Sequence, residues 1–222
     1  MRITNTLAVL FAALSLAAIA TPAHSSSPPN WTATVAVAED GTYTLGNPEA
    51  RVQVIEFVSY TCPHCANFQK QAEAPLRLAY VMPGKVSVRV VHFVRDSVDL
   101  TIGLLVQCGE PKGYFARHNQ FLQEQDRWLS KAGKLTKAQR DRWAAGDFAA
   151  GMRAIASDLA FYDLMAHRGY DRTKVDRCLG DTALANKLLA QYSDAKRLGV
   201  PGTPSFAIGG KLIDSAYDWP TL

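Results

Sequence analysis

Two cysteines separated by two residues, Cys62 and Cys65, are the residues of this sequence whose type and spacing best suit chemistry. They directly follow residues 52–58, a run of apolar and β-branched residues that is typical of a buried strand. Downstream of the pair, apolar residues recur at helical spacing: Phe68, Ala72, Leu76, Ala79 and Tyr80. The pattern therefore predicts that a strand turns into a helix here, with Cys62 at the N-terminus of the helix.

A thiol at the start of a helix loses its proton more easily than a free cysteine, because the unpaired N–H groups and the helix dipole favour negative charge. We therefore expect Cys62 to be the reactive thiolate. His64 lies between the two cysteines and can add a favourable interaction, and the ring of Pro63 fits the first helical turn. Since the thiolate exists only in the reduced form, its stabilisation makes the disulfide a stronger oxidant.

Glu56 is an acidic residue in the otherwise apolar strand that precedes the cysteine pair. Burial would raise the pKa of its carboxyl group and make it a proton acceptor or donor for Cys65. The alternative is an acid at the edge or rim of a sheet with no chemical role.

Other uses of the cysteine pair fit the sequence less well. A structural zinc site usually has four Cys or His ligands in two close pairs, whereas Cys108 and Cys178 each stand alone. Attachment of a c-type haem requires a histidine directly after the second cysteine, where this chain has Ala66. A purely structural disulfide would be unusual at a helix start. Exchange between thiols and disulfides needs neither a metal nor an organic cofactor, and we predict none. The other histidines are scattered without ligand spacing, and we expect each to be structural or on the surface: His24, His92, His118 and His167.

The N-terminus has the pattern of a secretory signal peptide over residues 1–23: a positive charge at Arg2, an apolar run over residues 7–20, and small residues at the expected cleavage sites. We predict that residues 24–38 form a flexible leader, since residues 25–29 are all Ser or Pro. Export would place the cysteines in an oxidising compartment. The formal net charge of +4, with basic and acidic residues interleaved, is too small to indicate a nucleic-acid partner.

The remaining pattern predicts an α/β protein with a mixed sheet. A second strand over residues 86–94 follows the first helix and completes a βαβ unit, and residues 205–208 and 211–213 form a hairpin around two glycines. Between them, residues 99–198 show helical periodicity throughout. We expect one helix to include Leu159 to Met165, and another to be capped by Asp181 before it and Gly199 after it. We therefore expect a core from residues 39–98 and 199–222, with residues 99–198 as a helical insertion.

A specific resemblance begins at residues 199–205, Gly-Val-Pro-Gly-Thr-Pro-Ser, which are similar to the cis-proline loop of thioredoxin folds. Together with residues 45–48, the strand containing Glu56, the Cys62-Pro63-His64-Cys65 motif and the inserted helices, this loop resembles the DsbA family over nearly the whole chain after the signal. The resemblance implies a thioredoxin-like fold with an all-helical insertion. It also implies that Pro204 follows a cis peptide bond from Thr203 and lies against the cysteine pair, so that the Thr203 backbone is free to bind an extended substrate.

The resemblance further implies a periplasmic thiol:disulfide oxidoreductase, acting as a monomer without a cofactor. Its substrates would be reduced, unfolded exported proteins, and a membrane re-oxidase such as DsbB would restore its disulfide. Thr203 stands where well-studied oxidase members carry an apolar residue. A disulfide isomerase or reductase therefore remains an alternative, as does a thioredoxin-fold binding or chaperone module with incidental redox activity.

Cys108 and Cys178 are expected to form a structural disulfide, a pairing that the family resemblance supports. Each precedes a glycine, Gly109 and Gly180, near an expected helix end, where turns could bring the two together. The alternative is two buried free cysteines that pack as small hydrophobic residues.

Overall fold

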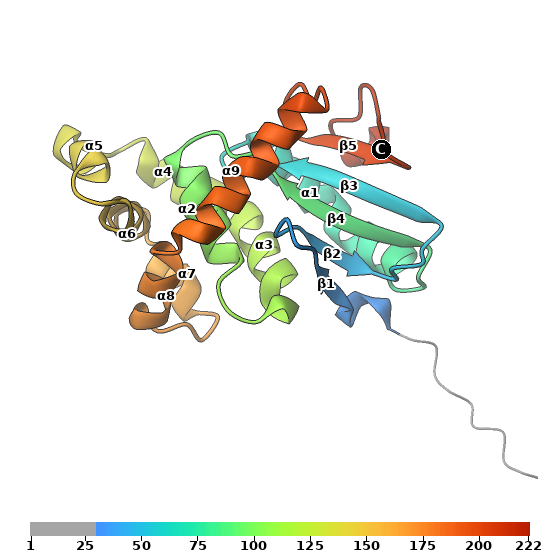
Figure 1. Cartoon of the computed structure of the whole chain (residues 1–222), viewed down its shortest axis with the longest axis horizontal. Helices are drawn as coiled ribbons and strands as arrows, with labels where there is room; N and C mark the ends of the chain where they lie inside the picture. The colour runs from blue at the N-terminus through green and yellow to red at the C-terminus, as the bar shows by residue number, and fades with distance from the viewer. Residues whose placement is uncertain (1–29) are drawn as a thin grey trace, which may run out of the picture.

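The computed structural model describes residues 30–222, so the expected signal peptide over residues 1–23 lies outside the described residues. A six-stranded sheet crosses the molecule in the order β1-β2-β4-β3-β5-β6 (Figure 1). Only β3 and β4 run parallel, and every other pair of neighbours is antiparallel. The strands are β1 (Val35–Val37), β2 (Tyr43–Gly46), β3 (Val52–Val58), β4 (Val86–His92), β5 (Ser205–Ile208) and β6 (Lys211–Leu212). The mixed α/β sheet expected from the sequence is confirmed.

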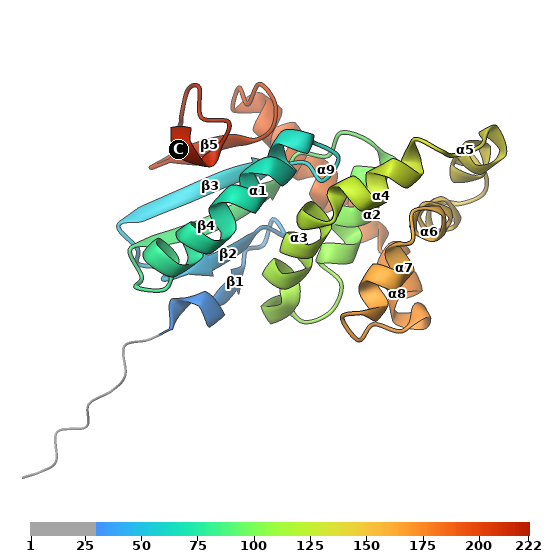
Figure 2. The ribbon, with the colours of Figure 1, turned by 180° about the vertical axis from the view of Figure 1, so that it is seen from behind.

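The parallel pair is the expected βαβ unit, in which α1 (Pro63–Pro75) connects β3 to β4. At Pro75 the α-helix ends and the chain continues as a π-helical segment, η2 (Leu76–Val81). A proline ring removes one helical hydrogen bond and crowds the preceding turn, which accounts for the change at this residue. Helix α1 covers one face of the sheet (Figure 2), whereas α9 lies across the other face (Figure 1).

Side chains along β3 alternate between these two faces. Val54 packs with Phe68 and Ala72 of α1 in one apolar cluster, whereas Phe57 packs with Ala195 of α9 in another. Glu56 is two residues along the strand from Val54, so its side chain points to the same face, toward α1.

The segment between β4 and β5 contains only helices, and these supply most of the largest apolar cluster. They are α2 (Ser97–Val106), η3 (Pro111–Gly113), α3 (Tyr114–Gln123), α4 (Gln125–Ala132), α5 (Lys137–Ala144), α6 (Phe148–Asp158), α7 (Phe161–Ala166), α8 (Arg172–Leu179) and α9 (Thr182–Arg197). The expectation of one helix from Leu159 to Met165 is wrong. The chain breaks at Ala160, which has a left-handed φ of 61°, and α7 begins after it.

A disulfide joins Cys108, just after α2, to Cys178 in α8. The two Cα atoms are 5.5 Å apart, within the usual range for a bridge. The bond therefore connects two helices that are distant in the sequence, as the pairing expected from the family resemblance requires.

Part of the expected leader has regular structure instead. Within residues 30–38 the chain forms η1 (Trp31–Ala33) and then β1, which pairs with β2 from Val35 opposite Leu45. The apolar run Val35–Val37 is too short to stand out in the sequence as a strand, and it becomes one through its pairing with β2.

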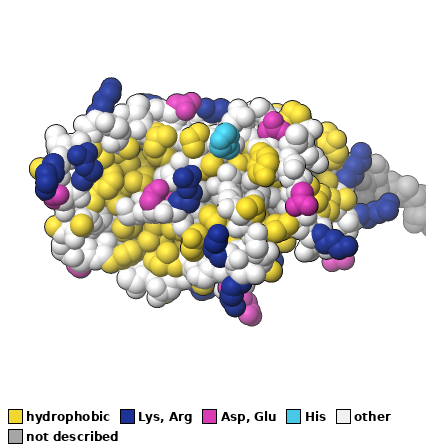
Figure 3. All heavy atoms as spheres, turned by 90° about the horizontal axis from the view of Figure 1, so that it is seen from above, with side chains coloured by type: hydrophobic (Ala, Val, Ile, Leu, Met, Phe, Trp, Pro, Cys, Tyr) yellow, Lys and Arg dark blue, Asp and Glu magenta, His cyan; other side chains and the backbone are white. Residues whose placement is uncertain are grey.

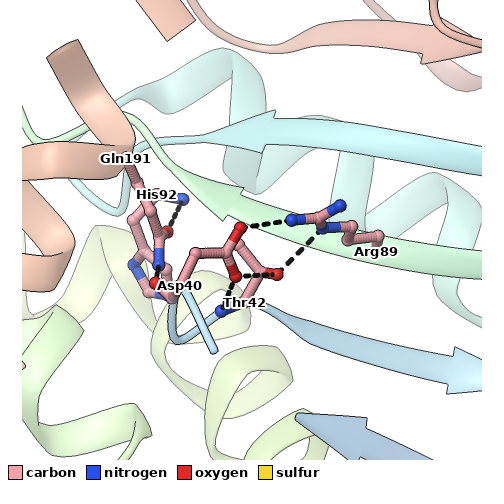
Figure 4. A network of polar contacts seen from close by, with 5 residues as sticks. All are labelled: Asp40, Thr42, Arg89, His92 and Gln191. Atoms are coloured by element: carbon pink, nitrogen blue, oxygen red, sulfur yellow. Dashed lines mark hydrogen bonds and ion pairs between the residues drawn. The ribbon is translucent and has the colours of Figure 1, made fainter. Parts of the chain in front are cut away.

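A polar network fixes the turn between β1 and β2 to both β4 and α9 (Figure 4). The Asp40 carboxylate forms an ion pair with Arg89, whose Nε also donates to Thr42 Oγ1 at 2.8 Å. Gln191 of α9 accepts from the His92 backbone N–H at 2.8 Å and donates to the Asp40 carbonyl at 2.9 Å. The last helix of the insertion is thereby tied to the sheet.

The hairpin at the end of the chain is confirmed, because β5 pairs with β6 around Gly209 and Gly210, both with positive φ. A short 3-10 helix, η4 (Trp219–Thr221), follows it. Across residues 30–222, none of the helices combines the length and apolar character that a bilayer crossing requires.

Candidate active site

The cysteine pair lies where the sequence predicts it, at the start of α1. Cys62 is the N-cap residue, with an extended backbone, and Pro63 is the first helical residue. Both cysteines are free thiols; Cys62 is 3% exposed and Cys65 is fully buried. Both cysteines are therefore buried at the start of α1.

The pKa of Cys62 is lowered to about 5. A hydrogen bond from the Cys65 thiol is the largest cause, and the Thr203 side chain and the backbone N–H groups of Cys65 and His64 add to it. These hydrogen bonds outweigh burial, which acts in the opposite direction. Cys62 is thus a thiolate at neutral pH.

The pKa of Cys65 is shifted in the opposite direction. Burial raises the pKa of its thiol well above the usual value, and the nearby Cys62 sulfur and the Glu56 carboxyl raise it further. Environments that push two neighbouring groups apart assign their roles. At neutral pH Cys65 therefore holds its proton far more strongly than Cys62 does.

The loop before β5 lies directly against Cys62. The peptide bond between Thr203 and Pro204 is cis. The Thr203 carbonyl oxygen lies 3.1 Å from the Cys62 sulfur and accepts a hydrogen bond from it only while that thiol is protonated. Ser205 pairs with Phe57 near the end of β3, so the sheet itself brings this loop beside the start of α1. Cys62 and Thr203, which are more than a hundred positions apart in the sequence, therefore meet here, as the family resemblance implies.

His64 contributes differently from expectation. Its side chain is exposed, and its contribution to the Cys62 pKa comes from the backbone N–H. Pro63 is also exposed, so the two residues between the cysteines form the outer surface of the motif.

Glu56 is a buried acid with a raised pKa. Its side chain is 3% exposed, and burial raises the pKa of its carboxyl to about 7. Strand β3 lies between β4 and β5, so Glu56 does not lie in an edge strand of the sheet. Within the described residues, Glu56 Oε1 has no hydrogen-bond partner. The carboxyl group is therefore able to exchange a proton with its surroundings near neutral pH.

Two buried residues of the helical segment hold the chain just before the motif, and sequence reasoning missed both. Gln125 Nε2 donates to the carbonyls of Tyr60 and Cys62 at 2.6 and 2.9 Å. Asp99 accepts from the Tyr60 backbone N–H at 2.7 Å and from the Ser59 hydroxyl at 2.6 Å. No short-range pattern could have found them, because each lies about 40 to 65 residues from its partners.

Two of the remaining histidines are structural. His118 Nδ1 and the Tyr60 hydroxyl are 2.9 Å apart, and His92 Nε2 is 3.0 Å from the Tyr114 hydroxyl. Burial lowers the pKa of both imidazoles to about 3, so they stay neutral at physiological pH. His167 is exposed, and His24 lies outside the described residues. Within residues 30–222, no three or more His, Cys, Asp or Glu side chains are grouped so that they could hold a metal ion.

Comparison with known proteins places this geometry in a family. The family model described as thioredoxin matches residues 38–222. A crystal structure of a protein-disulfide isomerase from Novosphingobium aromaticivorans is 47% identical, with a TM-score of 0.79, over 82% of this chain and 94% of that chain. The alpha-DsbA1 structure from Wolbachia pipientis has the same fold, with a TM-score of 0.62 at 22% identity, over 82% of this chain and 81% of that chain.

Curated relatives agree with the structural ones. A protein from Rickettsia prowazekii, named as a candidate protein-disulfide oxidoreductase, is 26% identical over 81% of this chain. The thiol:disulfide interchange protein DsbA of Bordetella parapertussis is 24% identical over 74% of this chain and 66% of its own length. The chain spans 63% of the length of the Rickettsia protein.

The chain therefore belongs to the thioredoxin family, and the expected resemblance to the DsbA proteins of that family is confirmed. The thioredoxin-like fold with a helical segment between β4 and β5 is confirmed with it.

Proposed function

We propose that this protein is an exported thiol:disulfide oxidoreductase that introduces disulfide bonds into reduced, unfolded proteins through Cys62 and Cys65. The observation that carries the proposal is the opposite pKa shift of the two thiols, down for Cys62 and up for Cys65. A stabilised thiolate favours the reduced enzyme, so the oxidised enzyme readily gives its disulfide to a substrate.

The reaction starts from the enzyme with a Cys62–Cys65 disulfide. A substrate thiolate attacks the Cys62 sulfur, a new sulfur–sulfur bond forms to the substrate, and Cys65 leaves as the thiolate. A second substrate thiolate then attacks the substrate sulfur of this mixed disulfide and releases Cys62 as the leaving thiolate. Two substrate thiols are oxidised to one disulfide, and the enzyme disulfide is reduced to two cysteines.

Cys65 must gain a proton in this cycle, because its buried thiolate is unfavourable. Glu56, whose pKa of about 7 lets it carry a proton at neutral pH, is the group we assign to this transfer. Its influence on the Cys65 pKa supports the assignment.

Substrate would bind along the Thr203–Pro204 loop, where an extended chain can pair with the Thr203 backbone. The N-terminal end of α1 points to the top of the molecule in Figure 2, and hydrophobic side chains gather on the upper face in Figure 3. Such a surface suits unfolded polypeptides, which expose apolar side chains.

The place of action and the partners form part of the same proposal. The signal-peptide pattern over residues 1–23 supports export to the periplasm. There a membrane re-oxidase such as DsbB would restore the disulfide, and the protein would act as a monomer. Residues 39–98 and 199–222 would carry out the exchange, with residues 99–198 as the inserted helical unit.

Disulfide isomerase is the second candidate, because the Novosphingobium structure that is 47% identical is described as a protein-disulfide isomerase. An isomerase uses the same Cys62 thiolate but works from the reduced enzyme. Three assays run side by side separate the activities: oxidation of reduced ribonuclease, refolding of scrambled ribonuclease, and reduction of insulin. Faster oxidation than refolding supports the oxidase, and the reverse order supports the isomerase.

The mechanism itself is tested by trapping. Replacement Cys65→Ser removes the thiol that resolves the intermediate, so mixed disulfides with substrates should accumulate through Cys62. The matched variant Cys62→Ser should trap none. Trapping that requires Cys65 would reverse the assigned roles, and a Cys62→Ser protein that retains full activity toward unfolded substrates would favour a binding or chaperone module.

A further inference from the structure

A cavity of about 220 Å³ lies between the sheet and the pair α1 and α3, behind the cysteine motif. We call it the α1–sheet cavity. Figure 2 shows α1 crossing in front of the sheet with α3 beside it. Apolar side chains from β2, β4, α1 and α3 line much of its wall, among them Leu45, Phe68, Ala72, Val88 and Phe115.

One ionisable group among these walls has no partner. Glu56 lines the cavity and is 3% exposed, and its Oε1 atom makes no hydrogen bond within the described residues. A buried acceptor without a partner is unfavourable, because it has lost its hydrogen bonds to water and gained none in the protein. A molecule that brings a hydrogen-bond donor to this atom would supply the missing hydrogen bond.

The open end of the cavity differs from its interior. Exposed Arg77, Lys112 and Ala116 are among the residues that line it, so they mark the mouth. Arg77 is paired with Glu73, and Lys112 forms no ion pair within the described residues. The unpaired positive charge at the mouth disfavours entry of a cation.

We propose that the α1–sheet cavity binds a small apolar molecule that carries one hydroxyl group, with this hydroxyl hydrogen-bonded to Glu56. The site is distinct from the surface that would bind polypeptides, and it does not depend on the redox function proposed above.

Size and charge define this ligand class. An apolar cavity of about 150 Å³ holds benzene, so the α1–sheet cavity has room for a ring with a short substituent. A hydroxyl can donate to an ionised carboxylate and accept from a protonated one, so it fits Glu56 in both states. An amine would have to bring its charge past Lys112 and leave water, which is costly.

The test uses benzyl alcohol as the probe, with toluene and benzylamine for comparison. Each is titrated into the purified protein while backbone amide signals are followed by nuclear magnetic resonance. Benzyl alcohol should bind with a dissociation constant at or below about 1 mM. The perturbed amides should be those around Ala72, Val88 and Phe115. Toluene should bind roughly tenfold more weakly, because it leaves Glu56 without a donor.

Two variants locate the site. Glu56→Leu should abolish the preference for benzyl alcohol over toluene, which a purely structural change would not do selectively. Ala116→Trp should block the mouth and weaken both probes. Because Ala116 is exposed, this variant should fold, and Ala190→Trp, at an exposed position of α9, is its matched control.

Several results would overturn the proposal. Absence of saturable binding would mean that the cavity takes up only water. Equal or tighter binding of toluene, tighter binding of benzylamine, or unchanged binding in Ala116→Trp would each show that Glu56 or the α1–sheet cavity is not the site.

Discussion

The side-chain amide of Gln125 donates hydrogen bonds to two carbonyls, that of Tyr60 and, at 2.9 Å, that of Cys62. Gln125 begins α4, so the inserted helical segment directly holds the N-cap residue of α1. The insertion thus determines the position of the reactive sulfur as well as covering it.

Replacement Gln125→Met keeps the shape of this side chain but removes the donor to the Tyr60 carbonyl and one of the two donors to the Cys62 carbonyl, which also accepts from the Ala66 N–H. The free energy of unfolding should fall by about 1–3 kcal/mol. The start of α1 should also move, and this should raise the pKa of Cys62. A loss of stability alone would leave that pKa unchanged. Denaturant unfolding and a thiolate titration measure the two effects. The exposed neighbour variant Gln123→Met is the control, and an unaltered Cys62 pKa in Gln125→Met would contradict the positioning role.

The Cys62 thiolate should titrate with a midpoint near 5, followed by its ultraviolet absorbance. Because the folded pKa lies below the unfolded value, ionisation stabilises the reduced protein fully above the unfolded pKa, and this stabilisation is lost as the pH falls through about 5. As the pH falls from about 8.5 to about 5, the reduced protein should therefore lose stability relative to the oxidised protein. A midpoint of about 8 or above, close to that of a free cysteine, contradicts both expectations.

Glu56→Gln should stabilise the protein in a pH-dependent way. Burial raises the folded pKa of this acid from 4.5 to about 7, so its contribution is most favourable below pH 4.5 and is lost as the pH rises through 7. Denaturant unfolding should show that the free energy of unfolding of the variant rises little near pH 4.5 and by about 3 kcal/mol above pH 7. Disulfide exchange should slow at the step that protonates Cys65. A gain that is independent of pH would mean that Glu56 does not titrate in this range.

Thr203→Val removes the hydroxyl that lowers the Cys62 pKa but keeps the backbone carbonyl. The pKa of Cys62 should rise by about one unit, and the reduction potential should become more negative by about 30 mV. A redox titration against glutathione measures the change. Thr203→Ser, which retains a hydroxyl, should stay close to the parent protein, and an unchanged potential in Thr203→Val would show that the side chain is inert.

The Cys108–Cys178 disulfide closes a loop with a sequence separation of 70 residues. In the chain-entropy model such a loop stabilises the protein by about 4 kcal/mol, against about 2 kcal/mol for the short loop of the active pair. Replacing both residues with Ala should lower the free energy of unfolding by about that larger amount. Mild reductant should release two thiols from the native oxidised protein, and reduction under denaturing conditions two more. Four free thiols in the native oxidised protein would show that the bridge is absent.

Local patterns in the sequence were sufficient for β3, α1, β4, α9 and the hairpin of β5 and β6. In each of these elements the apolar periodicity and the end signals agree, as at Asp181, which caps α9. The same agreement placed Cys62 at a helix start. The strand β1 and the break at Ala160 carry no such signal, because a three-residue strand and one left-handed residue depend on neighbours that are remote in the sequence.

The sequence by itself determined the chemistry of the site: two cysteines at a helix start, an acid in the preceding strand, and a proline loop beside a hairpin. The tertiary structure decided what these groups do, because a pKa depends on burial and on hydrogen bonds from distant residues. Thr203 reaches Cys62 only through the pairing of β5 with β3, and Gln125 reaches it only through the packing of the insertion. Contacts between residues so far apart depend on the whole fold, and no local pattern records them.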